Sequence, residues 1–181
     1  MAVRKEYRGI VGAAAKAAGL IGVPGAFSFG LDATAMTGIW AAMIVALGAK
    51  SNHKVDKIFA AKLATGILTR IAAYVTGSKI AMKLLHLIPG AGSIAAMGVN
   101  GTLNYVFTYR VGHAISNLFA KGSYDEADMK VLLTTVLSLV GSKATLAEIT
   151  DMATLGSETV DSELVTSFQK PELFGTFEDA S

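Results

Sequence analysis

Two long stretches of the chain contain almost no charged side chains. In residues 17–49 the only charged residue is Asp32, and residues 84–109 contain none at a pH where histidine is neutral. Each stretch exceeds the roughly 20 apolar residues that a helix needs to span a bilayer. Proline and glycine clusters at 22–25 and 89–92 interrupt both stretches, because proline disrupts helical hydrogen bonding. The pattern is typical of buried helices, re-entrant segments or marginal membrane spans.

The spacing of apolar residues along the chain is helical. No segment of about four to eight residues alternates cleanly between apolar and polar side chains, whereas apolar residues recur at helical intervals throughout. The sequence therefore predicts an all-α fold in the form of a compact helical bundle.

Two parts of the chain resemble each other when one is shifted by 68 residues. The matched residues are Gly22 with Gly90, Gly30 with Gly98, Asp32 with Asn100, and Thr34 with Thr102. We predict two similar helix-turn-helix units, at about 18–70 and 86–140, that pack about a pseudo-twofold axis. In this arrangement Asp32 and Asn100 form a buried polar pair.

Capping signals predict three short helices after residue 122. Ser123 with Glu126 forms a capping box for a helix that stops at Gly141, and Thr145 with Glu148 forms a second one.

The third helix is predicted to start after Ser157 and to finish before Pro171, because the residue before a proline avoids the helical conformation. Residues 172–181 have little to bury, so we expect a mobile tail.

Composition strengthens the expectation of a membrane or a large buried core. The chain of 181 residues is 52% hydrophobic, with a mean hydropathy of +0.49. Only 17% of its residues are charged, against about 25% in soluble proteins. The absence of cysteine excludes disulfides, thiolate metal sites and cysteine nucleophiles.

Charge divides the chain into two regions. Residues 1–121, an apolar basic body, carry 13 Lys and Arg against three acids, a net charge of +10. Residues 122–181, an acidic helical region, carry three Lys against 11 acids, a net charge of −8. The acidic region either faces water or folds back on the body.

Small residues recur every four positions in the first apolar stretch and predict a helix-packing ridge. They are Gly30, Thr34, Gly38, Ala42 and Ala46. Such a ridge allows close approach of a second helix, in a membrane or in a soluble bundle.

Asp32 needs a polar partner, because an unpaired buried carboxylate costs several kcal/mol. It is either a coupling or ligand site, or a structural group that caps a helix or hydrogen-bonds to Asn100 or Thr102.

Five lysines are the candidate lipid contacts. On helical spacing, three share one face and two share another: Lys50, Lys54 and Lys57, then Lys79 and Lys83. Basic amphipathic helices bind anionic headgroups, at about 1 kcal/mol per basic residue near the surface. The solvated face of a soluble bundle would show the same pattern.

No catalytic or metal-binding pattern is evident. His53, His86 and His113 are 33 and 27 residues apart, so the sequence does not predict a metal site. We see no Ser/His/Asp arrangement and no close carboxylate pair. Basic and aromatic residues are not interleaved, so nucleic acid is not an expected partner. We predict a protein that is not an enzyme and has no cofactor.

Two motifs resemble bacterial helical families. The segment LIPGAGS at 87–93, followed by Gly98, Asn100, Thr102 and RVGHA at 110–114, resembles the YcjF-type domain.

The earlier segment VPG at 23–25, running through Gly30 and Asp32 to Gly48, is similar to the EcsC-like family, in which a Pro-Gly turn precedes an aspartate-bearing helix. Together the two resemblances cover about 18–121. They imply a membrane-associated bacterial helical protein, and a GTPase partner for any nucleotide chemistry.

These observations favour a membrane-associated helical scaffold or adaptor with lipid and protein contacts. We expect it at the cytoplasmic side of the membrane, as a peripheral or an integral protein, since the N-terminus lacks the layout of a signal peptide. One alternative is a soluble, cytoplasmic bundle that binds a hydrophobic ligand or forms a homo-oligomer. The other is a pore-forming protein.

Overall fold

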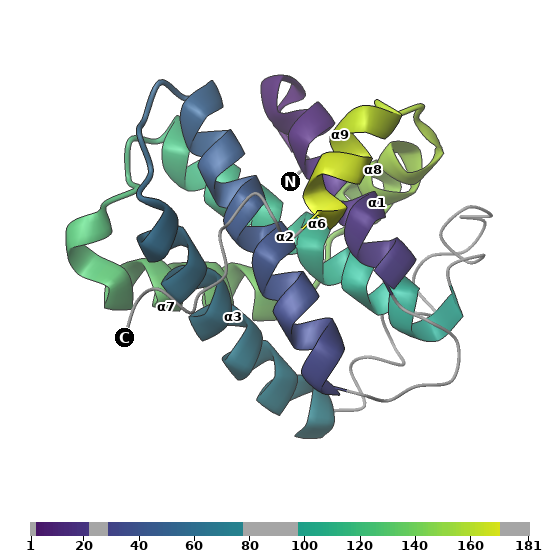
Figure 1. Ribbon diagram of the computed structural model, residues 1–181, viewed down its shortest axis with the longest axis horizontal. Coiled ribbons are helices and arrows are strands. Elements are labelled where there is room, and N and C mark those ends of the chain that lie inside the picture. Colours follow the sequence, from purple (N-terminus) through teal and green to yellow (C-terminus); the bar gives the residue numbers. More distant parts are fainter. Residues whose placement is uncertain (1–2, 22–28, 78–97, 171–181) are drawn as a thin grey trace.

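The computed structural model describes residues 3–21, 29–77 and 98–170, and within these ranges it contains helices and no strand (Figure 1). The elements are η1 (Lys5–Tyr7), α1 (Arg8–Ile21), α2 (Phe29–Lys50), α3 (Lys57–Gly77), α6 (Gly98–Ala120), η2 (Glu126–Asp128), α7 (Met129–Gly141), α8 (Leu146–Ser157) and α9 (Ser162–Gln169). The predicted all-α fold is confirmed.

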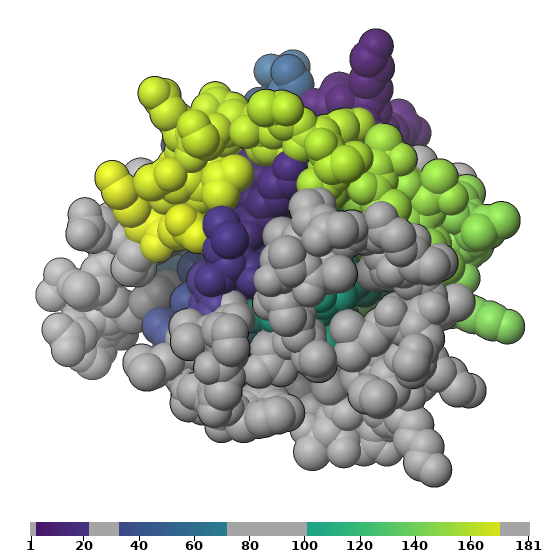
Figure 2. All heavy atoms as spheres, turned by 90° about the vertical axis from the view of Figure 1, so that its right-hand side faces the viewer, coloured from purple at the N-terminus to yellow at the C-terminus, as the bar shows by residue number. Residues whose placement is uncertain are grey.

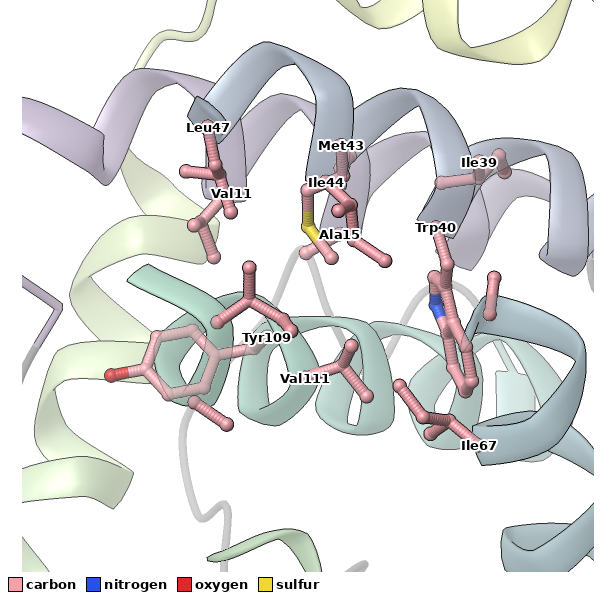
Figure 3. Close-up of a cluster of buried hydrophobic side chains, with 14 of the residues drawn as sticks. Val11, Ala15, Ile39, Trp40, Met43, Ile44, Leu47, Ile67, Tyr109 and Val111 are labelled. Atoms are coloured by element: carbon pink, nitrogen blue, oxygen red, sulfur yellow. The ribbon is translucent and has the colours of Figure 1, made fainter. Parts of the chain in front are cut away.

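Helix α2 lies at the centre of the described bundle, with α1, α3, α6 and α9 packed around it. Five of its large apolar side chains are at most 1% exposed: Ile39, Trp40, Met43, Ile44 and Leu47. Figure 3 shows Leu47 and Met43 beside Val11 and Ala15 of α1, and Trp40 beside Ile67 of α3. Burial of each large side chain contributes about 1.5–3 kcal/mol.

The one tryptophan joins α2 to α6 by a polar contact inside this core. The indole N–H of Trp40 donates to Thr108 Oγ1 at 2.8 Å. This bond satisfies a buried donor that would otherwise be costly.

Helix α1 lies very close to α6 because glycine faces it. A Cβ atom on Gly112 would lie 2.9 Å from the Met43 sulfur and 2.9 Å from both Val11 methyl groups. Only a residue without a side chain fits this crossing of three helices.

Helices α8 and α9 close the core over α1. Both pack against α1, and Figure 2 shows them above it. Met152, Leu155 and Phe168 are buried and belong to the same hydrophobic cluster as the side chains of α2 and α6. The basic body and the acidic region therefore share one core.

Helices α2 and α6 end in the same way. Each is followed by a residue with positive φ, Asn52 at 56° and Gly122 at 64°. The amide of His53 donates to the carbonyl of Gly48 at 2.9 Å, and the Ser123 amide bonds in the same way to the carbonyl five residues before it, at 2.8 Å. These are the bonds of a Schellman cap. The predicted duplication itself stays a prediction, because residues 78–97 lie outside the described part.

The first predicted capping box is wrong. Helix α7 begins at Met129, and Asp128 caps it by accepting from the Val131 amide at 3.0 Å. Ser123 is instead part of the turn that closes α6. The Glu126 side chain accepts from the Asp56 amide at 3.1 Å, so it does not reach back to Ser123.

The second capping box is correct in its first half. Thr145 Oγ1 accepts from the Glu148 amide at 3.2 Å and starts α8. The third helix has a different cap, because Asp161 and not Ser157 precedes it. It ends at Gln169, before Pro171 as predicted.

Candidate functional site

The three lysines predicted to share a helical face are exposed, but they do not lie on one helix. Lys50 is the last residue of α2, Lys57 is the first of α3, and Lys54 lies in the turn between them. The positive φ of Asn52 ends α2 and breaks the helical periodicity that the prediction assumed. Lys79 and Lys83 lie outside the described residues.

Two further cations lie on α3, and the helical spacing of lysines alone missed them. Lys62 and Arg70 are exposed, and the segment 57–77 has no acidic residue. That absence is the signal in the sequence that could have found them. We call Lys50, Lys54, Lys57, Lys62 and Arg70 the basic surface.

No side chain of the basic surface forms an ion pair within the described part of the chain. The nearest acid in sequence is Asp56, and its carboxylate accepts from the Phe59 amide at 2.8 Å as the cap of α3. The cations therefore face solvent with their charge available to an anionic partner.

The acids of the C-terminal region are used differently, because α8 folds back onto the body. Asp151 is buried and accepts from three donors distant in sequence: the Val3 amide at 3.0 Å, the Tyr109 hydroxyl at 2.5 Å and the Arg8 guanidinium. Of the two predicted arrangements of the acidic region, the folded-back one holds for α8.

These contacts control the ionisation of Asp151. Burial alone would raise the pKa of this carboxyl, but the hydrogen bonds from Tyr109, the Val3 amide and Arg8 outweigh it and lower the pKa below its usual value. Burial, together with the bond to Asp151, raises the pKa of the Tyr109 hydroxyl. The carboxylate stays charged and the phenol neutral at physiological pH.

A second buried pair holds the corner between α7 and α8. Arg110 Nε lies 2.7 Å from Glu148 Oε1, and the other guanidinium nitrogens donate to the Val140 carbonyl at 2.5 Å and to Ser142 Oγ at 3.2 Å. One buried cation therefore caps α7 at its carboxyl end and fixes the start of α8.

A third contact, with Glu158, lies at the surface. Arg8 also binds the Glu158 carboxylate at 2.7 Å, and the Lys16 ammonium donates to the backbone carbonyl of Glu158. The result is a division of charge: the cations of α1 and Arg110 are paired with the acidic region, while the basic surface is not.

The predicted packing ridge does not lie along a uniformly close contact. Ala42 is buried and Ala46 half-buried, but Thr34 is exposed. A Cβ atom on Gly38 would have no neighbour within 4 Å. The side chains of Asp32 and Asn100, and the surroundings of Gly30, lie outside the described residues, so the buried polar pair stays a prediction.

Two buried polar atoms have no hydrogen-bond partner in the described structure: His113 Nε2 and the Tyr124 hydroxyl. Burial lowers the pKa of His113, and this effect outweighs the attraction of the Glu148 and Asp151 carboxylates of α8 for a protonated ring. Tyr124 stacks on Phe119 with ring centres 4.2 Å apart.

Among the described residues, no group of three His, Asp or Glu side chains could hold a metal ion. The same residues contain one helical stretch, Ala33–Lys50 of α2, that is long and apolar enough to cross a membrane. A buried core helix of a soluble protein meets the same criterion.

Neither a protein-family model, nor a curated protein, nor a solved structure matches this chain. The resemblance to the EcsC-like and YcjF-type families therefore stays a prediction.

Proposed function

We propose that this protein is a membrane-associated helical scaffold that binds anionic lipid through the basic surface. The observation that carries the proposal is the division of charge. Three acids of the C-terminal region, Glu148, Asp151 and Glu158, are paired with Arg8 and Arg110. The five cations at 50–70 are exposed and have no acidic partner among the described residues. The cytoplasmic leaflet is the proposed surface, because its lipids are negatively charged.

The burial of α2 supports a peripheral position. This helix is the one unbroken span candidate among the described residues, but Ile39, Trp40, Met43 and Ile44 are buried in the core that it shares with other helices of the same chain. Crossing a bilayer would require separating α2 from α1, α3 and α6. Protein contacts therefore shelter the buried side chains of α2 from water.

Flotation with lipid vesicles tests the proposal. The full chain should float with phosphatidylcholine vesicles that contain about 30% phosphatidylserine, should not float with phosphatidylcholine alone, and should detach as salt rises. The triple variant Lys54→Glu, Lys57→Glu, Lys62→Glu should bind about a hundredfold more weakly, since each lysine contributes about 1 kcal/mol.

A matched control has the same change in net charge. Lys5→Glu, Lys143→Glu and Lys170→Glu also reverse three exposed lysines, but none belongs to the basic surface. This variant should retain most of the binding. Equal losses in the two variants, or no flotation of the unmodified chain at low salt, would exclude the proposal.

The burial of α2 also fits a second candidate, a bundle that binds a hydrophobic ligand or forms a homo-oligomer. Native mass spectrometry distinguishes the two. A co-purifying lipid or a fixed stoichiometry, without flotation, would favour the second candidate.

A further inference from the structure

Helices α3 and α7 lie side by side and begin at the same end of the bundle. The Asp56 amide donates to Glu126 Oε1 at 3.1 Å, just before the two helices start. Farther along, a Cβ atom on Gly66 of α3 would lie 3.4 Å from a Leu133 methyl group of α7. The two helices therefore form one layer, which we call the α3–α7 layer (Figure 1).

The first turn of each helix in this layer exposes a lysine followed by a β-branched apolar residue. The pairs are Lys57 with Ile58 on α3, and Lys130 with Val131 on α7. Ile58 and Val131 are each 58% exposed. Surfaces that lie at a membrane interface combine exposed large apolar side chains with neighbouring lysines, as these two pairs do.

Helices α3 and α7 themselves carry four basic side chains: Lys57, Lys62, Arg70 and Lys130. Neither α3 nor α7 contains an acidic residue. Acids occur just before both helices, and those carboxylates accept hydrogen bonds from backbone amides: Asp56 from Phe59, Asp125 from Ala127, Glu126 from Asp56 and Asp128 from Val131. They are held at the amino ends of the helices, where the helix dipole offsets part of their charge.

We propose that the α3–α7 layer is the face that rests on the lipid, with Ile58 and Val131 inserted below the headgroups and Lys57 and Lys130 beside them at phosphate level. This inference rests on the proposed function and extends it. It adds α7, which belongs to the acidic part of the sequence, to the lipid contact. It also makes binding depend on two apolar side chains as well as on charge.

Serine substitutions test the apolar part without changing net charge. The double variant Ile58→Ser, Val131→Ser should bind vesicles with about 30% phosphatidylserine about tenfold more weakly, because it removes two apolar side chains that the lipid would bury. Both side chains are exposed, so the thermal unfolding temperature should change little.

Two exposed leucines outside the layer provide the control. Leu20 on α1 is 61% exposed and Leu146 on α8 is 80% exposed. The variant Leu20→Ser, Leu146→Ser removes as much exposed apolar surface, and its binding should stay within about twofold of the unmodified chain. An equal loss in the two double variants would overturn the inference.

The absence of cysteine allows an environment-sensitive fluorophore at a single position. A probe on Val131→Cys should shift to the blue when vesicles are added, whereas a probe on Thr154→Cys, an exposed position on α8, should not. If the chain floats but the probe at position 131 stays in water, the inference is overturned and the proposed function stands.

Two further outcomes would also overturn the inference. A blue shift at position 131 without vesicles that grows with protein concentration would show that a second copy covers this face, and would overturn the inference. Failure of the unmodified chain to float would overturn the inference together with the proposed function.

Discussion

Asp151 links the first residues of the chain to α6 and α8 through one carboxylate. Its partners are the Val3 amide, the Tyr109 hydroxyl and the Arg8 guanidinium. Removing one member of a buried charge pair destabilises a protein more than replacing both members with apolar residues, because the remaining charge is left desolvated and unpaired.

We therefore expect Asp151→Asn to lower the free energy of unfolding by about 2–3 kcal/mol, since Arg8 and Tyr109 lose a charged acceptor. The midpoint of thermal unfolding should fall by roughly 5–10 °C. Circular dichroism melting curves measure this.

Glu158→Gln is the matched control, because Glu158 binds the same arginine with a side chain that is 42% exposed. Its effect should stay below about 1 kcal/mol, as for other surface ion pairs. Equal effects of the two substitutions would show that the buried contacts of Asp151 stabilise the fold no more than a surface ion pair does.

His113 gives stability a pH dependence of known sign. Burial lowers its pKa in the folded state, so the unfolded chain binds the proton first, at about pH 6.5. Folding stability should therefore fall as pH drops from about 7 to 5, with a slope below the limit of about 1.4 kcal/mol per pH unit for one proton, since part of the ring is exposed.

His113→Gln should remove this part of the slope, as measured by urea unfolding at several pH values. His53→Gln controls for the loss of a histidine at an exposed position. A slope that persists unchanged in His113→Gln would assign the pH dependence to other groups. The contribution of Asp151, whose pKa is lowered, is lost only at more acidic pH, below about 3.9.

At the level of helices, two glycines with helical backbones should respond in opposite ways to alanine. Gly112→Ala places a methyl group 2.9 Å from atoms of Val11 and Met43, and should cost about 1–3 kcal/mol through overpacking. Gly38→Ala meets nothing within 4 Å and should gain about 0.5–1 kcal/mol through helix propensity. Urea unfolding compares them, and a stabilising Gly112→Ala would contradict the close crossing of α1 and α6.

For α7, α8 and α9, the sequence predicted the existence of each helix more accurately than the residue at which it begins. Apolar periodicity and the Gly141, Thr145 and Pro171 signals are local, so they place the helices α7 to α9 nearly correctly. The exact starts of α7 and α9 were missed, because aspartates at 128 and 161 took the caps assigned to serines. Before each helix the sequence offers both a serine and an aspartate, Ser123 and Asp128 for α7 and Ser157 and Asp161 for α9. Serine and aspartate are equally good N-caps, so the sequence alone does not choose between them.

The candidate site could be predicted only in part. Exposed lysines near residue 50 follow from local sequence, but their assignment to one helix failed at Asn52, which ends α2 in a left-handed conformation. Asparagine is enriched in that conformation, so this residue was a weak signal for the end of the helix. The buried pairs of Asp151 and Glu148 could not be predicted, because an acid in an acidic segment resembles a solvated residue. Their partners, Arg8 and Arg110, are 143 and 38 residues away.

For the whole molecule, the shared core implies that the basic body cannot fold alone. Leu132, Val136, Met152, Leu155 and Phe168 are buried against it. A fragment of residues 1–121 should therefore lack a cooperative thermal transition and bind a hydrophobic dye. A fragment that melts cooperatively would show two separable domains instead.

The bond between Val3 and Asp151 also has a consequence for synthesis. The two residues are 148 positions apart, and a ribosome adds about 5–20 residues per second, so the acceptor emerges roughly 7–30 s after the donor. Throughout that interval α1 has been synthesised with its alanine-rich surface, but α8 and α9, which cover this surface in the folded protein, have not. Exposed apolar surface on a nascent chain is prone to aggregate, so we expect the biogenesis of this protein to depend more on chaperone supply than the stability of the finished fold does.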